Sequence, residues 1–196
     1  MDDDELMART AAGEEEAFRL LVERWERPLF SLLYHLTGSL DDTLDLRQET
    51  FLRVFAQAGR YRPQGRFRIW LFRIAGNLAR SRYRRRRILR WVRFDPQEHD
   101  LPAAAEAPDA SVERAELREA VRRALAALPE RQREAVVLRR YHDLSYREIA
   151  GVLGTSEEAV ESLLQRAAGA LRRELAGVAR GSPGVKKGGA GREGSN

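Results

Sequence analysis

The spacing of apolar residues is the feature that most constrains how this chain can fold. Apolar side chains recur at intervals of three and four residues, and the alternating β-branched stretches typical of strands are absent from the sequence. An interval of three to four residues places these side chains along one stripe of an α-helix. Hydrophobic residues make up 43% of the chain, which is enough to build packed cores. The sequence therefore predicts an all-α protein.

Two segments interrupt this periodicity and divide the chain. Residues 95–110 (DPQEHDLPAAAEAPDA) contain three prolines and several acids, a composition typical of a linker. Residues 179–196 are rich in glycine and serine and have little to bury, which predicts a flexible tail. We therefore predict two small helical domains, residues 1–94 and 111–178, joined by a flexible linker.

The first domain is predicted to contain three main helices. A long amphipathic helix covers residues 18–36 and should stop at Gly38, and Pro28 should kink or interrupt it. A second helix is expected over about 41–58, and a third begins near residue 67. The core stripe of the third helix is Phe67, Trp70, Leu71, Ile74 and Leu78.

The second domain carries the sharpest local pattern. After helices predicted over 112–128 and 130–141, Ser145 and Glu148 form a capping box, and Gly154 closes the short helix that follows. Thr155 and Glu158 repeat the box before a longer helix. This layout is typical of a helix-turn-helix that reads the DNA major groove, although other antiparallel helix pairs share its elements. The groove-facing residues of the longer helix would be Glu161, Ser162, Gln165 and Arg166.

Charge is distributed very unevenly along the chain. Residues 60–93 hold thirteen arginines and no acid, four of them consecutive from Arg84 to Arg87. A solvated face is the ordinary explanation of a charge run, but the mutual repulsion of these arginines favours a polyanionic partner. Tyr83, Trp91 and Phe94 lie among them and are candidates either for stacking on unpaired bases or for the core.

The second helix carries an acidic and amide stripe formed by Asp41, Asp45, Gln48 and Glu49. These residues fall on one face, opposite apolar Leu44, Phe51 and Phe55. Taken without context, the stripe is equally compatible with a solvated face and with a surface that docks a protein partner.

Sequence motifs for catalysis are absent. His35, His99 and His142 lie far apart in the sequence without metal-ligand spacing, and no glycine-rich phosphate loop or nucleophile elbow occurs. We therefore expect no enzymatic activity, no cofactor and no metal. The chain also has no cysteine, no secretory signal pattern and no apolar run of roughly 20 residues, which together favour a cytoplasmic protein.

Three stretches of the chain, in order, resemble the extracytoplasmic-function sigma factors of bacteria, which belong to the sigma-70 family. They are DLRQETFLRVF (45–55), GRFRIWLFRIAGNLARSRYRRRR (65–87) and LPERQREAVVLRRYHDLSYREIAGVLGTSEEAVESLLQRA (128–167). The resemblance spans roughly residues 14–175. It implies a region 2-like helical bundle and a region 4-like helix-turn-helix domain. It also implies a sigma factor that directs RNA polymerase core enzyme to promoter DNA, assists its opening and is restrained by an anti-sigma factor.

The resemblance also implies roles for particular residues. Asp45, Gln48 and Glu49 match the segment that grips the clamp helices of the largest polymerase subunit, and Asn77 matches the segment that captures a flipped base of the promoter −10 element. Residues 157–173 match the helix that reads the −35 element. The arginines that would hold phosphates near the −10 element are Arg80, Arg82, Arg84, Arg85, Arg86 and Arg87.

The chain departs from the family pattern at a few positions. Basic residues are common in the family where this chain has Glu161, Leu163 and Ala168, and arginine is frequent where it has Gly76. Two other functions are weighed against the sigma factor. One is a regulator that uses the same helix-turn-helix without joining polymerase. The other is a DNA-cleaving or recombining enzyme, which would need clustered carboxylates or a nucleophile with arginine and histidine partners.

Overall fold

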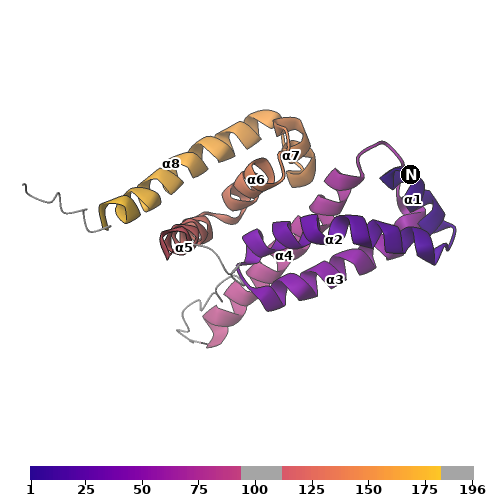
Figure 1. Cartoon of the computed structure of the whole chain (residues 1–196), viewed down its shortest axis with the longest axis horizontal. Helices are drawn as coiled ribbons and strands as arrows, with labels where there is room; N and C mark the ends of the chain where they lie inside the picture. Colours follow the sequence, from indigo (N-terminus) through magenta and orange to yellow (C-terminus); the bar gives the residue numbers. More distant parts are fainter. Residues whose placement is uncertain (94–111, 182–196) are drawn as a thin grey trace, which may run out of the picture.

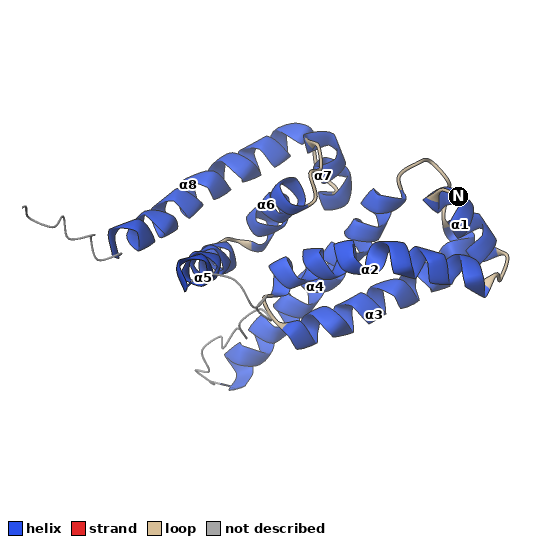
Figure 2. Cartoon of the chain, viewed as in Figure 1, coloured by secondary structure: helices blue, strands red, loops and turns tan. Residues whose placement is uncertain are grey.

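A computed structural model describes the backbone of residues 1–93 and 112–181, and the side chains of residues 1–85 and 117–176. Within these ranges all the regular secondary structure is helical, as Figures 1 and 2 show, which confirms the predicted all-α fold. The predicted linker (95–110) and residues 182–196 of the predicted tail lie outside the described residues. The elements are α1 (Asp3–Ala11), α2 (Glu15–Thr37), α3 (Leu40–Ala56), the short 3-10 helix η1 (Ala58–Arg60), α4 (Phe67–Arg93), α5 (Val112–Ala127), α6 (Glu130–Tyr141), α7 (Tyr146–Leu153) and α8 (Glu157–Gly181).

Helix α2 ends at the predicted position, but it is not interrupted at Pro28. Gly38 follows the helix with φ 66°, a left-handed conformation that glycine adopts without steric cost. Pro28 lies inside the helix, which continues through it, so the expected interruption is wrong. Leu29, Leu32 and Leu33 just beyond the proline are fully buried. Their packing compensates for the hydrogen bond that proline cannot donate.

Helix α1 was not predicted, because its short apolar pattern lies among many acidic residues. Asp2 caps it by accepting a hydrogen bond from the Glu5 amide at 2.8 Å, and Leu6 and Met7 are buried in the core. Asp4 accepts hydrogen bonds from the Tyr61 hydroxyl at 2.5 Å and from the Gly65 amide at 2.6 Å. The N-terminal acids therefore start a helix and tie it to the loop before α4.

The two helices of the predicted helix-turn-helix are present, with one correction. Ser145 and Glu148 form the predicted capping box of α7, and Gly154 follows that helix in a left-handed conformation. The predicted cap of α8 at Thr155 is wrong. Ser156 accepts from the Ala159 amide at 3.2 Å and caps α8, because its hydroxyl lies three residues before that free amide.

The two predicted domains pack against each other. Figure 1 shows α2, α3 and α4 side by side with α1 at one end, and α5 to α8 alongside them. Helix α4 contacts α7, and α2 contacts α6. We call this contact of α2 and α4 with α6 and α7 the interdomain seam. One hydrophobic cluster continues through the seam, whereas a smaller one joins α5, α6 and α8.

Two histidines lie in the seam. The ring of His35 on α2 lies 3.8 Å from that of Tyr141 on α6, and Phe72 on α4 meets His142 at 4.9 Å between ring centroids. Burial lowers the pKa of both imidazoles, and that of His142 falls to about 4. The positive charges of His35 and Arg68 also lower the pKa of His142, and the negative charge of Asp143 opposes them. The seam therefore favours neutral histidines.

Mild acid should lower the free energy of unfolding, because it protonates these histidines more readily in the unfolded chain. The folded chain binds fewer protons than the unfolded chain, because the pKa of His142 falls from 6.5 to about 4 on folding. The stability that the neutral ring provides is complete above pH 6.5 and is lost as the pH falls toward 4. Thermal unfolding followed by circular dichroism should give a Tm that falls over this range. A His142→Gln variant with an equally steep fall would contradict this origin.

Candidate polymerase and nucleic-acid interfaces

The predicted polymerase-binding residues lie on the outer face of α3. Asp45 and Gln48 are exposed, and Glu49 is half-exposed and accepts a hydrogen bond from Arg53 at 2.8 Å. The structure thus brings the three predicted residues together on one helix face, as the helical spacing indicated.

Exposed apolar side chains occur on the same helix. Leu44, Leu52 and Phe55 are 40%, 61% and 51% exposed, although their size and apolarity would favour burial. Leu44 and Phe55 were predicted to lie with Phe51 on the apolar side of the helix, yet only Phe51 of these three is buried. Apolar groups beside a charged stripe are typical of a protein-binding surface rather than of a purely solvated face.

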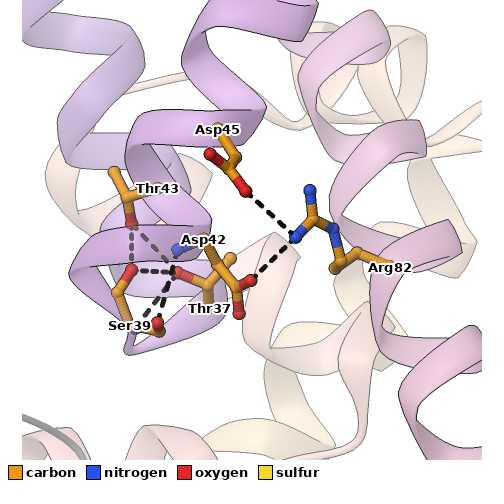
Figure 3. Close-up of polar contacts among 6 residues, drawn as sticks. All are labelled: Thr37, Ser39, Asp42, Thr43, Asp45 and Arg82. Carbon is orange, nitrogen blue, oxygen red and sulfur yellow. Dashed lines mark hydrogen bonds and ion pairs between the residues drawn. The ribbon is translucent and has the colours of Figure 1, made fainter. Parts of the chain in front are cut away.

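Arg82 connects α4 to the beginning of α3, as Figure 3 shows. One guanidinium nitrogen donates to Asp42 Oδ1 at 3.0 Å and lies 3.5 Å from Asp45 Oδ2. The Asp42 side chain is only 5% exposed, so the ion pair with Arg82 helps to stabilise its buried charge. Arg82, predicted to bind phosphate, therefore connects the predicted −10 residues of α4 to the predicted polymerase-binding residues of α3 inside the protein. Sequence reasoning missed Asp42, which follows Asp41 of the predicted stripe in the sequence but is buried.

Arg80 lies at the interdomain seam. It forms an ion pair with Glu134 of α6, and its second terminal nitrogen donates to the amide oxygen of Asn77. The Glu134 side chain is 2% exposed, and burial raises the pKa of its carboxyl group. Asn77 itself is exposed. The structure thus brings together two predicted −10 residues, with a buried acid that the sequence did not reveal.

The remaining arginines of the run point to solvent where the structure describes them. Arg84 and Arg85 are exposed, and a terminal nitrogen of Arg84 lies 3.4 Å from Ser81 Oγ. The side chains of Arg86 and Arg87, like those of Trp91 and Phe94, lie outside the described residues. Tyr83 is 41% exposed, and the Arg133 guanidinium lies 6.0 Å from the centre of its ring.

The predicted −35 residues share the exposed face of α8. Glu161, Ser162, Gln165 and Arg166 are all exposed, opposite an apolar stripe in which Val160 and Ala167 are fully buried. The Gln165 side chain donates to Glu161 Oε1 at 3.2 Å. These two residues therefore form a hydrogen-bonded pair one helical turn apart, a contact that the spacing allows but that was not predicted.

Two further findings concern the described part of the chain. No group of three or more acidic or histidine side chains gathers there in a way that would hold a metal ion. Among the helices of residues 1–93 and 112–181, none combines the length and the apolar character that a bilayer crossing demands.

Comparison with known proteins gives two family matches, one to each half of the chain. Residues 21–88 match the model of sigma-70 region 2, and residues 118–171 match that of sigma-70 region 4. The RNA polymerase sigma-H factor of Pseudomonas aeruginosa is 30% identical over 88% of this chain and 93% of its own length. The ECF RNA polymerase sigma factor SigE of Mycolicibacterium smegmatis is 38% identical over 80% of this chain, which spans 60% of that protein.

Solved structures show the same fold. CnrH, in complex with the cytosolic domain of CnrY, is 30% identical with a TM-score of 0.66 over 89% of this chain and 97% of CnrH. The sigma factor RpoE of Bartonella quintana, solved with the anti-sigma factor NepR, is 24% identical with a TM-score of 0.67 over 81% of this chain and 96% of RpoE. The chain belongs to the extracytoplasmic-function sigma factors of the sigma-70 family. It is therefore a factor of transcription initiation.

Replacing Arg82 should destabilise the fold, whereas replacing its exposed neighbour should not. Arg82→Ala removes a cation from the buried Asp42 carboxylate, at a cost of about 1–3 kcal/mol in the free energy of unfolding. Arg84→Ala removes an equal charge from the exposed surface and should change stability little. Urea unfolding measures both. Equal stability of the two variants would show that Arg82 does not hold α3 to α4.

Proposed function

We propose that this sigma factor acts through three surfaces on three helices. Helix α3 docks on RNA polymerase core enzyme, α4 holds the opened −10 element and α8 reads the −35 element. The first two surfaces lie in domain 1–94 and the third in domain 111–178. The observation that carries the proposal is that each of the three helices presents predicted binding residues to solvent: Asp45 and Gln48 on α3, Asn77, Arg84 and Arg85 on α4, and the four −35 residues on α8 of a chain that matches sigma-70 regions 2 and 4.

The α3 surface has the composition of a docking site. Asp45 and Glu49 supply negative charge, and Leu52 and Phe55 supply exposed apolar area one or two turns further along the helix. Charge attracts and orients a basic partner, while burial of the apolar groups provides the free energy that holds it. The clamp helices of the largest polymerase subunit are the partner implied by the family resemblance.

Charge reversal on α3 should abolish binding to core polymerase. Lysine at Asp45 and Glu49 opposes the attraction instead of merely removing it, and this effect exceeds the loss of the weak exposed contacts with Arg82 and Arg53. Affinity for purified core enzyme is the measurement, with circular dichroism to confirm helical content.

The matched control for this reversal is Glu15→Lys with Glu26→Lys, which makes the same change in charge on the exposed face of α2. The control should bind core polymerase as the wild type does. If the α3 variant binds core polymerase with wild-type affinity, the stripe is only a solvated face. If both variants lose affinity equally, the loss is an effect of net charge and not of the α3 surface.

On α4, we propose that Asn77 receives the flipped base and that the exposed arginines hold phosphates. Arg84 and Arg85 already face solvent, and Arg86 and Arg87 continue the same run. Arg80 and Arg82 differ, because each is paired with a buried carboxylate. They bind phosphate only after exchanging that partner.

Asn77→Ala should impair promoter opening more than initial binding, and Arg85→Ala should do the reverse. An amide reads a base, whereas an exposed guanidinium contributes a sequence-independent contact worth roughly 0.7–0.9 units of the log–log salt slope. Permanganate reactivity of the holoenzyme on promoter DNA reports opening, and filter binding against salt concentration reports the phosphate contact. Identical effects of the two variants on both measurements would defeat this division of roles.

On α8, we propose that the exposed quartet reads the −35 element in the major groove. Arg166 suits guanine and Gln165 suits adenine, while Glu161 accepts from a cytosine amino group. The hydrogen bond from Gln165 to Glu161 positions that carboxylate and reduces its repulsion of nearby phosphates. The hydrogen-bonded pair therefore allows an acidic side chain to contact a base at a position where the family commonly has a basic residue.

We also propose that an anti-sigma factor restrains this chain in the cytoplasm and that the chain catalyses no reaction itself. CnrH, 30% identical, was solved with the cytosolic domain of another protein, which supports control of this fold by a bound partner. Cytoplasmic location is supported by its family membership, because transcription takes place where the chromosome lies.

A further inference from the structure

Two glycines allow α4 to approach α6 and α7 closely at the interdomain seam. A Cβ atom at Gly76 of α4 would collide with Glu134 Oε1 of α6. A Cβ atom at Gly151 of α7 would lie 3.1 Å from Ile69 Cγ2 of α4, which is a tight contact. A side chain at residue 76 would therefore displace the Glu134 carboxylate from its present position, and one at residue 151 would require Ile69 to shift by a few tenths of an ångström.

Polar groups also join the two halves across this seam. The Arg80–Glu134 ion pair is almost completely enclosed, with side-chain exposures of 17% and 2%. Arg68 pairs with Glu148 of α7 at 2.8 Å, and Arg133 of α6 donates to the Leu36 carbonyl of α2 at 2.8 Å. Because the first pair is buried, salt screens it far less than an exposed pair.

This packed arrangement is incompatible with simultaneous contact to both promoter elements. The −10 and −35 elements lie about 25 base pairs apart, which is about 85 Å of duplex. Helix α7 contacts α4 directly, and α8 begins a few residues after α7. The whole of α8, with its 25 residues, is only about 38 Å long. The halves must therefore separate for Asn77 and Glu161 to reach their elements together.

We propose that the Arg80–Glu134 ion pair, seated over Gly76, is a latch that holds the polymerase-free chain closed. Closure withdraws Arg80 from DNA, and through Arg80 it occupies the amide oxygen of Asn77. Glu134 takes the place of a DNA phosphate on Arg80, so phosphate and carboxylate compete for one guanidinium. This inference rests on the proposed roles of α4 and α8 on promoter DNA.

The Arg80–Glu134 ion pair can be separated at a modest cost in free energy. The Oε1 atom of Glu134 is buried and has no hydrogen-bond partner among the described residues, so the carboxylate is incompletely compensated. Burial also raises the pKa of this group, which reflects the cost of keeping its charge away from water. An intact buried ion pair of this kind adds little net stability, whereas removal of one partner leaves the other charge uncompensated in the seam. Binding of polymerase or DNA therefore has only a modest cost to overcome.

The latch is tested by energy transfer between the two halves of the free chain. The sequence has no cysteine, so Glu26→Cys on α2 and Arg172→Cys on α8 give two exposed labelling sites. Gly76→Ala introduces the colliding Cβ, and Glu134→Gln removes the charge that holds Arg80. Gly59→Ala is the matched control, because a Cβ there meets no atom within 4 Å. Circular dichroism of each variant verifies helical content.

Transfer efficiency should be high in the wild type and in Gly59→Ala and should fall about twofold or more in Gly76→Ala and Glu134→Gln. The latch is overturned by equal efficiencies in all four proteins. Glu134→Gln keeps the proposal testable should Gly76→Ala fail to fold, because it adds no atom to the packed seam.

A second arm separates failure of the latch from failure of the proposed function. A single-stranded 30-nucleotide DNA of mixed sequence should bind the two opened variants about tenfold more tightly than the wild type. If the energy-transfer measurement shows that the variants are open but their affinity for the DNA is unchanged, the inhibitory role of the latch is overturned. Absence of DNA binding in every protein contradicts the proposed function of α4, and the transfer measurement, made without DNA, still decides whether the latch exists.

Discussion

The structure depends on helix α4 being packed on two faces at once. Its buried stripe, which includes Leu71 and Ile74, forms the core of the first half with α2 and α3. A second face, containing Phe72, Gly76 and Arg80, lies against α6 and α7. A helix buried on two sides leaves little surface for a ligand. The predicted −10 residues therefore share α4 with the contacts that close the molecule.

The sequence predicted the helices well because each depends on local information. Apolar spacing and a capping box located α6 and α7, and Gly38 marked the end of α2. Apart from the short helix α1, the missed features depend on residues far away in the sequence or on two neighbouring residues that could play the same role. Asp42 and Glu134 bind arginines 40 and 54 residues away, which no local pattern reveals. Thr155 and Ser156 are both good caps, so only the geometry of the turn selects one.

The same contrast applies to the arginine run, whose members are alike in sequence but not in environment. Arg80 and Arg82 are paired with buried acids, whereas Arg84 and Arg85 face solvent. Intramolecular acids that occupy part of a basic surface reduce sequence-independent attraction to DNA. A free sigma factor organised in this way would remain available for polymerase instead of being held on the chromosome, and docking would release the paired arginines for the promoter.

If the latch operates as proposed, the two halves must separate before the chain can engage promoter DNA. A disulfide between Ile69→Cys and Gly151→Cys would fasten α4 to α7, since Ile69 Cγ2 lies 3.1 Å from the position of a Cβ at residue 151. In vitro transcription with core polymerase, before and after reduction, is the most direct measurement. We expect the oxidised protein to be inactive and the reduced protein to regain activity. Equal transcription by the oxidised and reduced forms, with the disulfide verified by mass spectrometry, would contradict the account.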